Sequence, residues 1–205
     1  MAPAAGEVMD AFANRPARDR ADVFLASAAR RGIERAAIIE RDFWVCWTLA
    51  RIFVDHAVPS GASNSAEASI VFKGGTSLSK AYGAIERFSE DIDLTIDRHI
   101  IGFSGPEQDP TTQPSRTKAR ALLKSISEAG HIYVRGLLLD KLRQNIAATL
   151  GASAIWSIEP DPEDLATLIF RYPRALASEE YDSYVSPAVR LECGARGDVW
   201  PSVTK

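Results

Sequence analysis

Two aspartates that lie two residues apart, Asp91 and Asp93, are the residues of this chain best suited to hold a metal ion. The run from Asp91 to Ile96 alternates polar and apolar residues, which predicts a strand with both carboxylates on one face. Neighbouring carboxylates repel unless a cation or protons relieve the repulsion, and Mg²⁺ prefers such oxygen ligands. An acidic pair on a solvent-facing strand is the ordinary alternative, so the preceding segment decides how the pair is interpreted.

That segment contains two glycines and two hydroxyl residues, Gly74, Gly75, Thr76 and Ser77, between a short apolar run and a helical pattern. A helix start of this kind presents unpaired backbone N–H groups and hydroxyls, and it therefore suits a phosphate. An ordinary strand-to-helix turn with a capping hydroxyl fits the same residues. The spacing does not match the Walker A motif, which disfavours a P-loop nucleoside triphosphatase. A phosphate-binding turn next to a metal-binding carboxylate pair indicates nucleotidyl transfer.

Further charged residues flank this segment. Lys80 follows Thr76 by one helical turn and is expected to reach a phosphate, with an ordinary surface lysine as the alternative. Arg87 is expected to contact the nucleotide or to neutralise the carboxylates. Glu192 lies on a later alternating run, and it becomes a third catalytic and metal-binding carboxylate if that strand lies beside the aspartates, which the sequence alone leaves open.

Histidine and cysteine offer no competing chemistry. The histidines, His56, His99 and His131, have no spacing typical of metal ligands. The two cysteines, Cys46 and Cys193, lie far apart and are expected to be free buried thiols in a reducing compartment.

Periodicity places the helices that must support these residues. Residues 18–57 predict two helices divided by Gly32. The second is expected to pack an apolar stripe against a sheet, formed by Ile39, Phe43, Cys46, Trp47, Ala50 and Phe53. Glu40, Arg41 and Asp42 are expected on its exposed face, and the alternative is that one of them orders the glycine turn. Residues 116–150 predict further helix, with breaks at Gly130 and Gly136.

The strands are expected at Ile70–Lys73, Ile92–Ile96, Ala154–Ile158, Leu168–Tyr172 and Ala188–Cys193, with a helix over Leu78–Ile85. Residues 59–67 and 102–115 are rich in turn residues and predict a linker and a second loop. The predicted fold class is α+β, with a small mixed sheet packed against helices. We expect an N-terminal helical region over residues 1–58 that packs on the sheet, and a core over residues 59–205 with a helical insertion at about 116–150.

The composition excludes some classes of protein. The chain has 205 residues and a net charge of −3, so nucleic-acid binding would need a local basic patch, for which Arg15, Arg18 and Arg20 are one candidate. Other candidates are Arg30, Arg31 and Arg35, and Arg116, Lys118, Arg120 and Lys124, and a solvated helix face is the alternative for each. No apolar run is long enough to span a bilayer and no signal peptide is evident, which predicts a cytoplasmic protein without membrane contact.

The glycine turn followed by Asp91 and Asp93 resembles the signature of the polymerase-beta-like nucleotidyltransferase fold. The longer string KGGTSLSKAYGAIERFSEDIDL is similar to the AbiEii abortive-infection toxin family. IIERDFWVCWTLARIF, RYPRA and VRLECGAR extend the resemblance more weakly over most of the chain.

The resemblance implies a toxin of a toxin–antitoxin pair in phage defence, which transfers NMP from an NTP to an RNA acceptor such as tRNA. Gly74, Gly75, Thr76 and Ser77 would then hold the triphosphate, and Asp91 and Asp93 would bind Mg²⁺, with Mn²⁺ as the alternative cation. A cognate antitoxin is a further expected partner. Members of the family continue past VRLECGAR into a helical region with a further Lys and Asp, which predicts that this chain is a shortened form.

Two other functions fit the same residues. A shortened chain could be a non-catalytic module that binds NTP or an antitoxin. The carboxylates could instead serve a phosphotransferase that moves the γ-phosphate.

Overall fold

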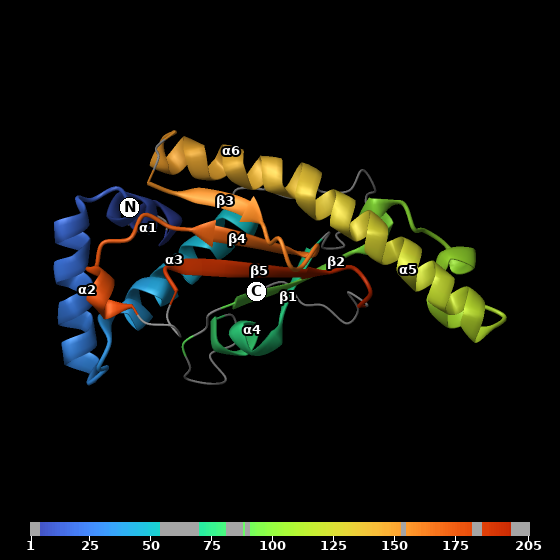
Figure 1. Ribbon diagram of the computed structural model, residues 1–205, viewed down its shortest axis with the longest axis horizontal. Coiled ribbons are helices and arrows are strands. Elements are labelled where there is room, and N and C mark those ends of the chain that lie inside the picture. The colour runs from blue at the N-terminus through green and yellow to red at the C-terminus, as the bar shows by residue number, and fades with distance from the viewer. Residues whose placement is uncertain are drawn as a thin grey trace.

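The computed structural model describes residues 5–53, 70–80, 88, 91–152, 155–181 and 186–197 (Figure 1). Its helices and a five-stranded mixed sheet form an α+β fold, as predicted. The predicted boundary between residues 58 and 59 falls on residues 54–69, outside the described part, and the division into two regions stays a prediction.

The sheet has the strand order β1-β2-β5-β4-β3. The strands are β1 (Ile70–Lys73), β2 (Asp91–Ile96), β3 (Ser157–Pro160), β4 (Thr167–Arg171) and β5 (Ala188–Gly194). Only β2 and β5 pair in parallel within this sheet, and the other neighbours are antiparallel. A parallel pair needs a long crossover, and here the helices and the β3–β4 hairpin supply it.

Three helices precede the sheet: α1 (Ala5–Ala13), α2 (Ala17–Arg31) and α3 (Ala36–Phe53). The structure confirms the division at Gly32, which caps α2 in the left-handed conformation with φ of 65°. Figure 1 shows α3 crossing behind the sheet. Trp44 and Trp47 of α3 are fully buried there, and their rings stack on Tyr172 and Phe170 at centroid distances of 5.5 and 5.9 Å. These aromatic contacts fix α3 on the sheet.

The predicted apolar stripe of α3 was wrong in its position. Trp47 is fully buried, but Phe53 at the end of the predicted stripe is 40% exposed. The buried face instead carries polar side chains that find partners, so hydrophobicity alone does not reveal it. Thr48 donates its hydroxyl to the Trp44 carbonyl, and Arg51 pairs with Asp10 at 3.1 Å while its guanidinium lies over Trp47.

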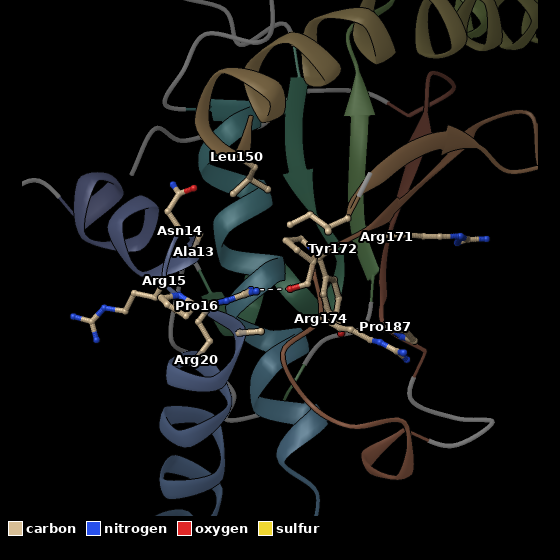
Figure 2. Close-up of a pocket in the computed structure, with 13 residues that line it drawn as sticks. Ala13, Asn14, Arg15, Pro16, Arg20, Leu150, Arg171, Tyr172, Arg174 and Pro187 are labelled. Atoms are coloured by element: carbon tan, nitrogen blue, oxygen red, sulfur yellow. Dashed lines mark hydrogen bonds between the residues drawn. The ribbon is translucent and has the colours of Figure 1, made fainter. Parts of the chain in front are cut away.

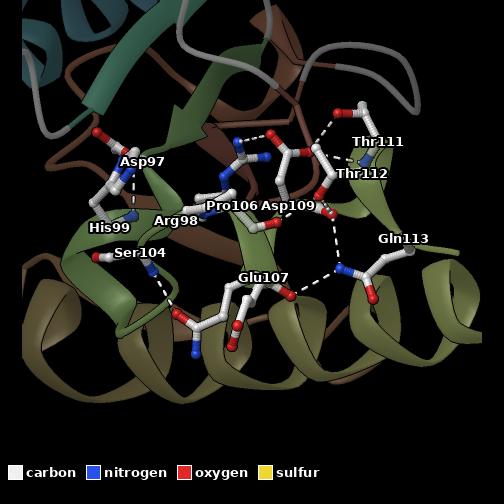
Figure 3. Close-up of polar contacts among 11 residues, drawn as sticks. Asp97, Arg98, His99, Ser104, Pro106, Glu107, Asp109, Thr111, Thr112 and Gln113 are labelled. Atoms are coloured by element: carbon white, nitrogen blue, oxygen red, sulfur yellow. Dashed lines mark hydrogen bonds and ion pairs between the residues drawn. The ribbon is translucent and has the colours of Figure 1, made fainter.

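After β2, the chain runs through three short 3₁₀ turns, η1 (Arg98–Ile101), η2 (Pro106–Gln108) and η3 (Pro110–Thr112). Figure 3 shows how their side chains hold this loop together. Asp97 caps η1 by accepting from the His99 N–H at 2.9 Å, and Arg98 pairs with Asp109 at 3.0 Å. The predicted loop over residues 102–115 is therefore tied by local hydrogen bonds.

The next helices are α5 (Arg116–Tyr133) and α6 (Leu139–Leu150), joined by a π-helical turn, η4 (Val134–Leu138). The predicted break at Gly130 was wrong, because α5 passes through it. A Cβ there would lie 2.8 Å from the Cβ of Ala195, so this glycine permits close packing of α5 on the end of β5. Gly136 lies within η4, so the chain stays helical at this glycine but changes from an α-helix to a π-helix.

Two further differences concern the last strands and the thiols. The strand predicted at Ala154–Ile158 begins later, at Ser157, and that predicted at Leu168–Tyr172 spans Thr167–Arg171. Cys193 is buried and free as expected, but Cys46 is only half-buried. Within the described ranges, no helix combines the length and hydropathy that a membrane crossing requires.

Candidate functional site

The parallel pairing of β2 with β5 brings Asp91, Asp93 and Glu192 onto one face of the sheet. Asp93 lies in register with Glu192, and Asp91 with Arg190. The opposite face is apolar, and its residues are buried at Ile92, Leu94, Val189, Leu191 and Cys193. The sequence left open whether Glu192 lies beside the aspartates, and the structure shows that it does.

The carboxylates of this face interact electrostatically. The pKa of Glu192 is raised, first by burial and then by the negative charges of Asp91 and Asp93. Arg190 opposes this shift, with its Nε 3.8 Å from Glu192 Oε1, but its Nη2 lies closer to Asp161, at 2.9 Å. The polar face is therefore acidic, because its arginine, Arg190, pairs mainly with Asp161.

This donor set suits a hard cation by its chemistry, since carboxylate oxygens are the ligands that Mg²⁺ and Mn²⁺ prefer. In the described part of the chain, however, no three His, Cys, Asp or Glu side chains converge on one ion as they stand. To bind one cation jointly, the three carboxylates would have to turn toward a common point on the face that they share.

The glycine turn lies directly against Asp93. The helix α4 (Gly74–Lys80) begins at Gly74, so the predicted four-residue turn is already helical and the predicted helix starts four residues earlier than expected. Gly74 has φ of +75°, and a Cβ there would lie 1.9 Å from Asp93 Oδ2. A glycine is therefore needed at this position both for its backbone conformation and for the space that the Asp93 carboxylate fills.

The hydroxyls of this turn contact the protein backbone. The Thr76 hydroxyl donates to the Asp91 carbonyl at 2.7 Å, and the Ser77 hydroxyl donates to the Gly74 carbonyl at 2.8 Å. Both side chains are buried. The Thr76 hydroxyl joins α4 to β2, and the Ser77 hydroxyl tightens the first turn of α4. These contacts are made to carbonyl groups, whereas the capping contact expected as the alternative is made to a backbone N–H.

Two lysines near the turn have different surroundings. Lys80 of α4 forms an ion pair with Asp42 of α3. Asp42 is one of the three charged residues that were predicted on the exposed face of α3, and this ion pair fixes α4 to α3. Lys73 lies in register with Asp93, and its Nζ lies 3.6 Å from the position that a Cβ on Gly194 would occupy. The Lys73 ammonium therefore extends across the polar face. Arg87 lies outside the described residues.

The expected exposure of Glu40 and Arg41 was wrong, because both are buried. Glu40 accepts hydrogen bonds from the Ala175 N–H at 2.6 Å and from the Tyr181 hydroxyl. These partners come from a segment about 135 residues later in the chain, so no local pattern could have revealed them. Burial raises the pKa of Glu40.

Replacing Glu40 with glutamine is expected to change how stability depends on pH. Because its pKa is raised on folding, Glu40 contributes stability that is fully present below the unfolded pKa, about 4.3, and is lost as the pH rises through the folded pKa. The wild type should therefore lose stability relative to Glu40→Gln as the pH rises. Urea unfolding at several pH values measures this, and a difference that moves in the opposite direction would contradict the assignment.

Comparison with known families shows which family this chain matches. The family model described as nucleotidyl transferase AbiEii toxin, type IV TA system, matches residues 62–205. This range contains β1, the glycine turn, β2 and β5, and so every residue of the polar face described above. No curated protein and no solved structure matches the chain.

Proposed function

The chain belongs to the AbiEii nucleotidyl transferase toxin family of type IV toxin–antitoxin systems, and from this premise we propose that it transfers NMP from a metal-bound NTP to an RNA acceptor. The observation that carries the proposal is the register of β2 and β5, which sets Asp93 beside Glu192 with the Gly74 backbone against Asp93. The family also supports a cognate antitoxin as a partner. Since NTP and RNA are the proposed substrates, we expect the reaction to occur in the cytoplasm.

In the proposed reaction, Asp91, Asp93 and Glu192 would hold Mg²⁺ or Mn²⁺, which would neutralise charge around the α-phosphorus. An acceptor hydroxyl forms the new bond to this phosphorus, pyrophosphate leaves, and a carboxylate of the same face takes up the hydroxyl proton. The chain's own contribution is to position these groups and to complement their charge. The backbone at Gly74 and Gly75 can approach the phosphates closely because neither residue has a side chain.

We further propose that Lys73 is the lysine that contacts the triphosphate. It is exposed, lies in register with Asp93, and makes no ion pair with the residues that the structure describes. Lys80, by contrast, is engaged with Asp42 and positions α4 on α3.

The two lysines offer a matched comparison. Lys73→Met should weaken NTP binding about 10- to 100-fold, the loss expected for a hydrogen bond to a charged group. Lys80→Met should leave NTP affinity nearly unchanged and lower the unfolding free energy by about 1 kcal/mol, because a partly exposed ion pair is lost. Calorimetric titration and thermal unfolding measure both effects. Equal losses of NTP affinity in the two variants would contradict these assignments.

The reaction type is tested with NTPs that carry the label on either the α- or the γ-phosphate, incubated with the protein, Mg²⁺ and total tRNA. The proposal predicts α-label in the RNA and release of pyrophosphate. Transfer of the γ-label with release of NDP would identify a phosphotransferase instead. Binding of NTP without any transfer would identify a non-catalytic module.

A further inference from the structure

Two ion pairs lie directly beside the candidate metal site and join it to the turn between β3 and β4. Arg190 of β5 lies in register with Asp91, and its Nε is 3.8 Å from Glu192 Oε1. The other end of the guanidinium contacts a carboxylate outside the site, with Nη2 2.9 Å from Asp161 Oδ2. A separation of 3.8 Å is too long for a hydrogen bond, so Asp161 is the main partner of this arginine.

Asp161 is held in place by contacts that do not involve this arginine. Its side chain is only 7% exposed, and its Oδ1 accepts from the Glu163 N–H at 2.8 Å. Its backbone N–H donates to the Thr167 carbonyl at 2.9 Å, and its carbonyl accepts from Arg135 of η4 at 3.1 Å. A nearly buried carboxylate is costly unless a cation pairs with it, and Arg190 supplies that positive charge. The turn therefore presents a fixed negative charge to one end of the guanidinium.

The direction of this guanidinium matters because an arginine and a metal ion compete for the same carboxylate oxygens. Arginine binds a carboxylate with two parallel hydrogen bonds, and such a pair would occupy both oxygens of Glu192. The turn is well placed to prevent this, since Thr167, to which Asp161 is hydrogen-bonded, lies in register with Glu192. In the structure, the end of the guanidinium that such a pair would use is directed to Asp161 instead.

We propose that Asp161 is a positioning residue for the metal site, which holds the Arg190 guanidinium away from Glu192 and so leaves this carboxylate open to the cation. The inference rests on the proposed function, in which Asp91, Asp93 and Glu192 would hold Mg²⁺ or Mn²⁺. Residues that orient metal ligands from outside the site change metal affinity about 10- to 100-fold when they are replaced. Asp161 acts in this way through Arg190, without contacting the cation.

The test is Mn²⁺ binding by the full chain in the absence of nucleotide, measured at one pH by electron paramagnetic resonance. Asp161→Asn should bind Mn²⁺ about 10- to 100-fold more weakly, because the neutral amide releases the guanidinium to Glu192. Asparagine keeps an oxygen that can accept from the Glu163 N–H, so the turn retains this hydrogen bond.

Removal of the competing arginine should reverse the effect. Arg190→Gln combined with Asp161→Asn should restore the Mn²⁺ affinity to at least that of the wild type. Arg190→Gln alone leaves the Asp161 turn unchanged in sequence and should bind Mn²⁺ at least as tightly as the wild type, because a positive charge beside the site is lost.

Arg171→Gln is the matched control for the loss of an arginine from the sheet. Arg171 of β4 lies in register with Ala188, four residues before Glu192 on β5, which puts it about 13 Å from that carboxylate along the strand. Figure 2 shows Arg171 at the edge of a cavity of about 660 Å³, with its guanidinium directed away from the cavity. Salt screens its charge at this distance, so Arg171→Gln combined with Asp161→Asn should bind Mn²⁺ as weakly as Asp161→Asn alone.

Unchanged Mn²⁺ affinity in Asp161→Asn would overturn the inference, as would weaker binding by Arg190→Gln alone. Failure of Arg190→Gln to restore the affinity of Asp161→Asn would also overturn it, because Asp161 would then act by itself, as a ligand or through the shape of its turn. An equal recovery with Arg171→Gln, or a wild type that binds no Mn²⁺, would have the same consequence. A wild type that binds Mn²⁺ with the expected effects but transfers no nucleotide would refute the proposed function alone.

Discussion

Replacing Asp93 with asparagine is expected to slow nucleotide transfer about 10²- to 10³-fold, the loss typical of one preorganised electrostatic contact at a reacting centre. Asp93 lies at the centre of the polar face, in register with Lys73 on one side and Glu192 on the other. Its carboxylate also lies against Gly74, where the phosphates are proposed to bind. Asparagine keeps the shape of the side chain, removes its charge and replaces one accepting oxygen with a donating NH₂ group.

The stability of this variant separates a catalytic role from a structural one. Because Asp93 raises the pKa of Glu192 through repulsion, removal of its charge should not lower the unfolding temperature. Asp140→Asn is the matched control, since Asp140 is an exposed carboxylate on α6. Steady-state transfer rates should fall for Asp93→Asn alone. A wild-type rate in Asp93→Asn would exclude Asp93 from the chemistry.

Gly74→Ala is expected to slow transfer about as much as Asp93→Asn does and also to destabilise the fold. The new Cβ would lie 1.9 Å from Asp93 Oδ2 and 2.7 Å from its Cγ, so either the carboxylate or the turn must move. The left-handed backbone conformation adds a cost of about 1–2 kcal/mol for any residue with a Cβ. Thermal unfolding and the transfer rate measure the two effects separately.

Gly32→Ala is a matched control for the backbone cost. Gly32 has φ of 65°, in the left-handed conformation, but a Cβ there would meet no atom within 4 Å. This variant should lose stability through backbone strain and keep its transfer rate. If Gly74→Ala behaved in the same way, the contact between the glycine turn and Asp93 would have no part in the activity.

Local patterns predicted the elements around the site well. Strand β1 has the predicted bounds, and the alternation in β2 and β5 correctly placed Ile92, Leu94 and Leu191 in the core. Each of these predictions depends on neighbours within one strand, which is the range over which sequence alternation carries information. The proximity of Glu192 to Asp93 depends on pairing across about 100 residues, which alternation does not encode.

The polar contacts could not be predicted in the same way. Glu40 resembles an exposed helical residue in sequence, but the chain between β4 and β5 covers it and supplies its hydrogen bonds. Lys80 and Lys73 both flank the glycine turn, and only the approach of α3 shows that Lys80 is already paired with Asp42. Hydrophobic periodicity misplaced the buried face of α3 for the same reason, since its charged residues are buried with partners from other elements.

The central claim is that Asp91, Asp93 and Glu192 form a site for a metal-bound nucleotide, and binding of Mn²⁺ tests it without knowledge of the acceptor. Electron paramagnetic resonance of Mn²⁺ with a non-hydrolysable NTP analogue would compare the wild type with Asp91→Ala combined with Asp93→Ala. We predict that the wild type binds Mn²⁺ and the analogue together and that the double variant does not. Equal binding of Mn²⁺ and nucleotide by the two proteins would contradict the claim.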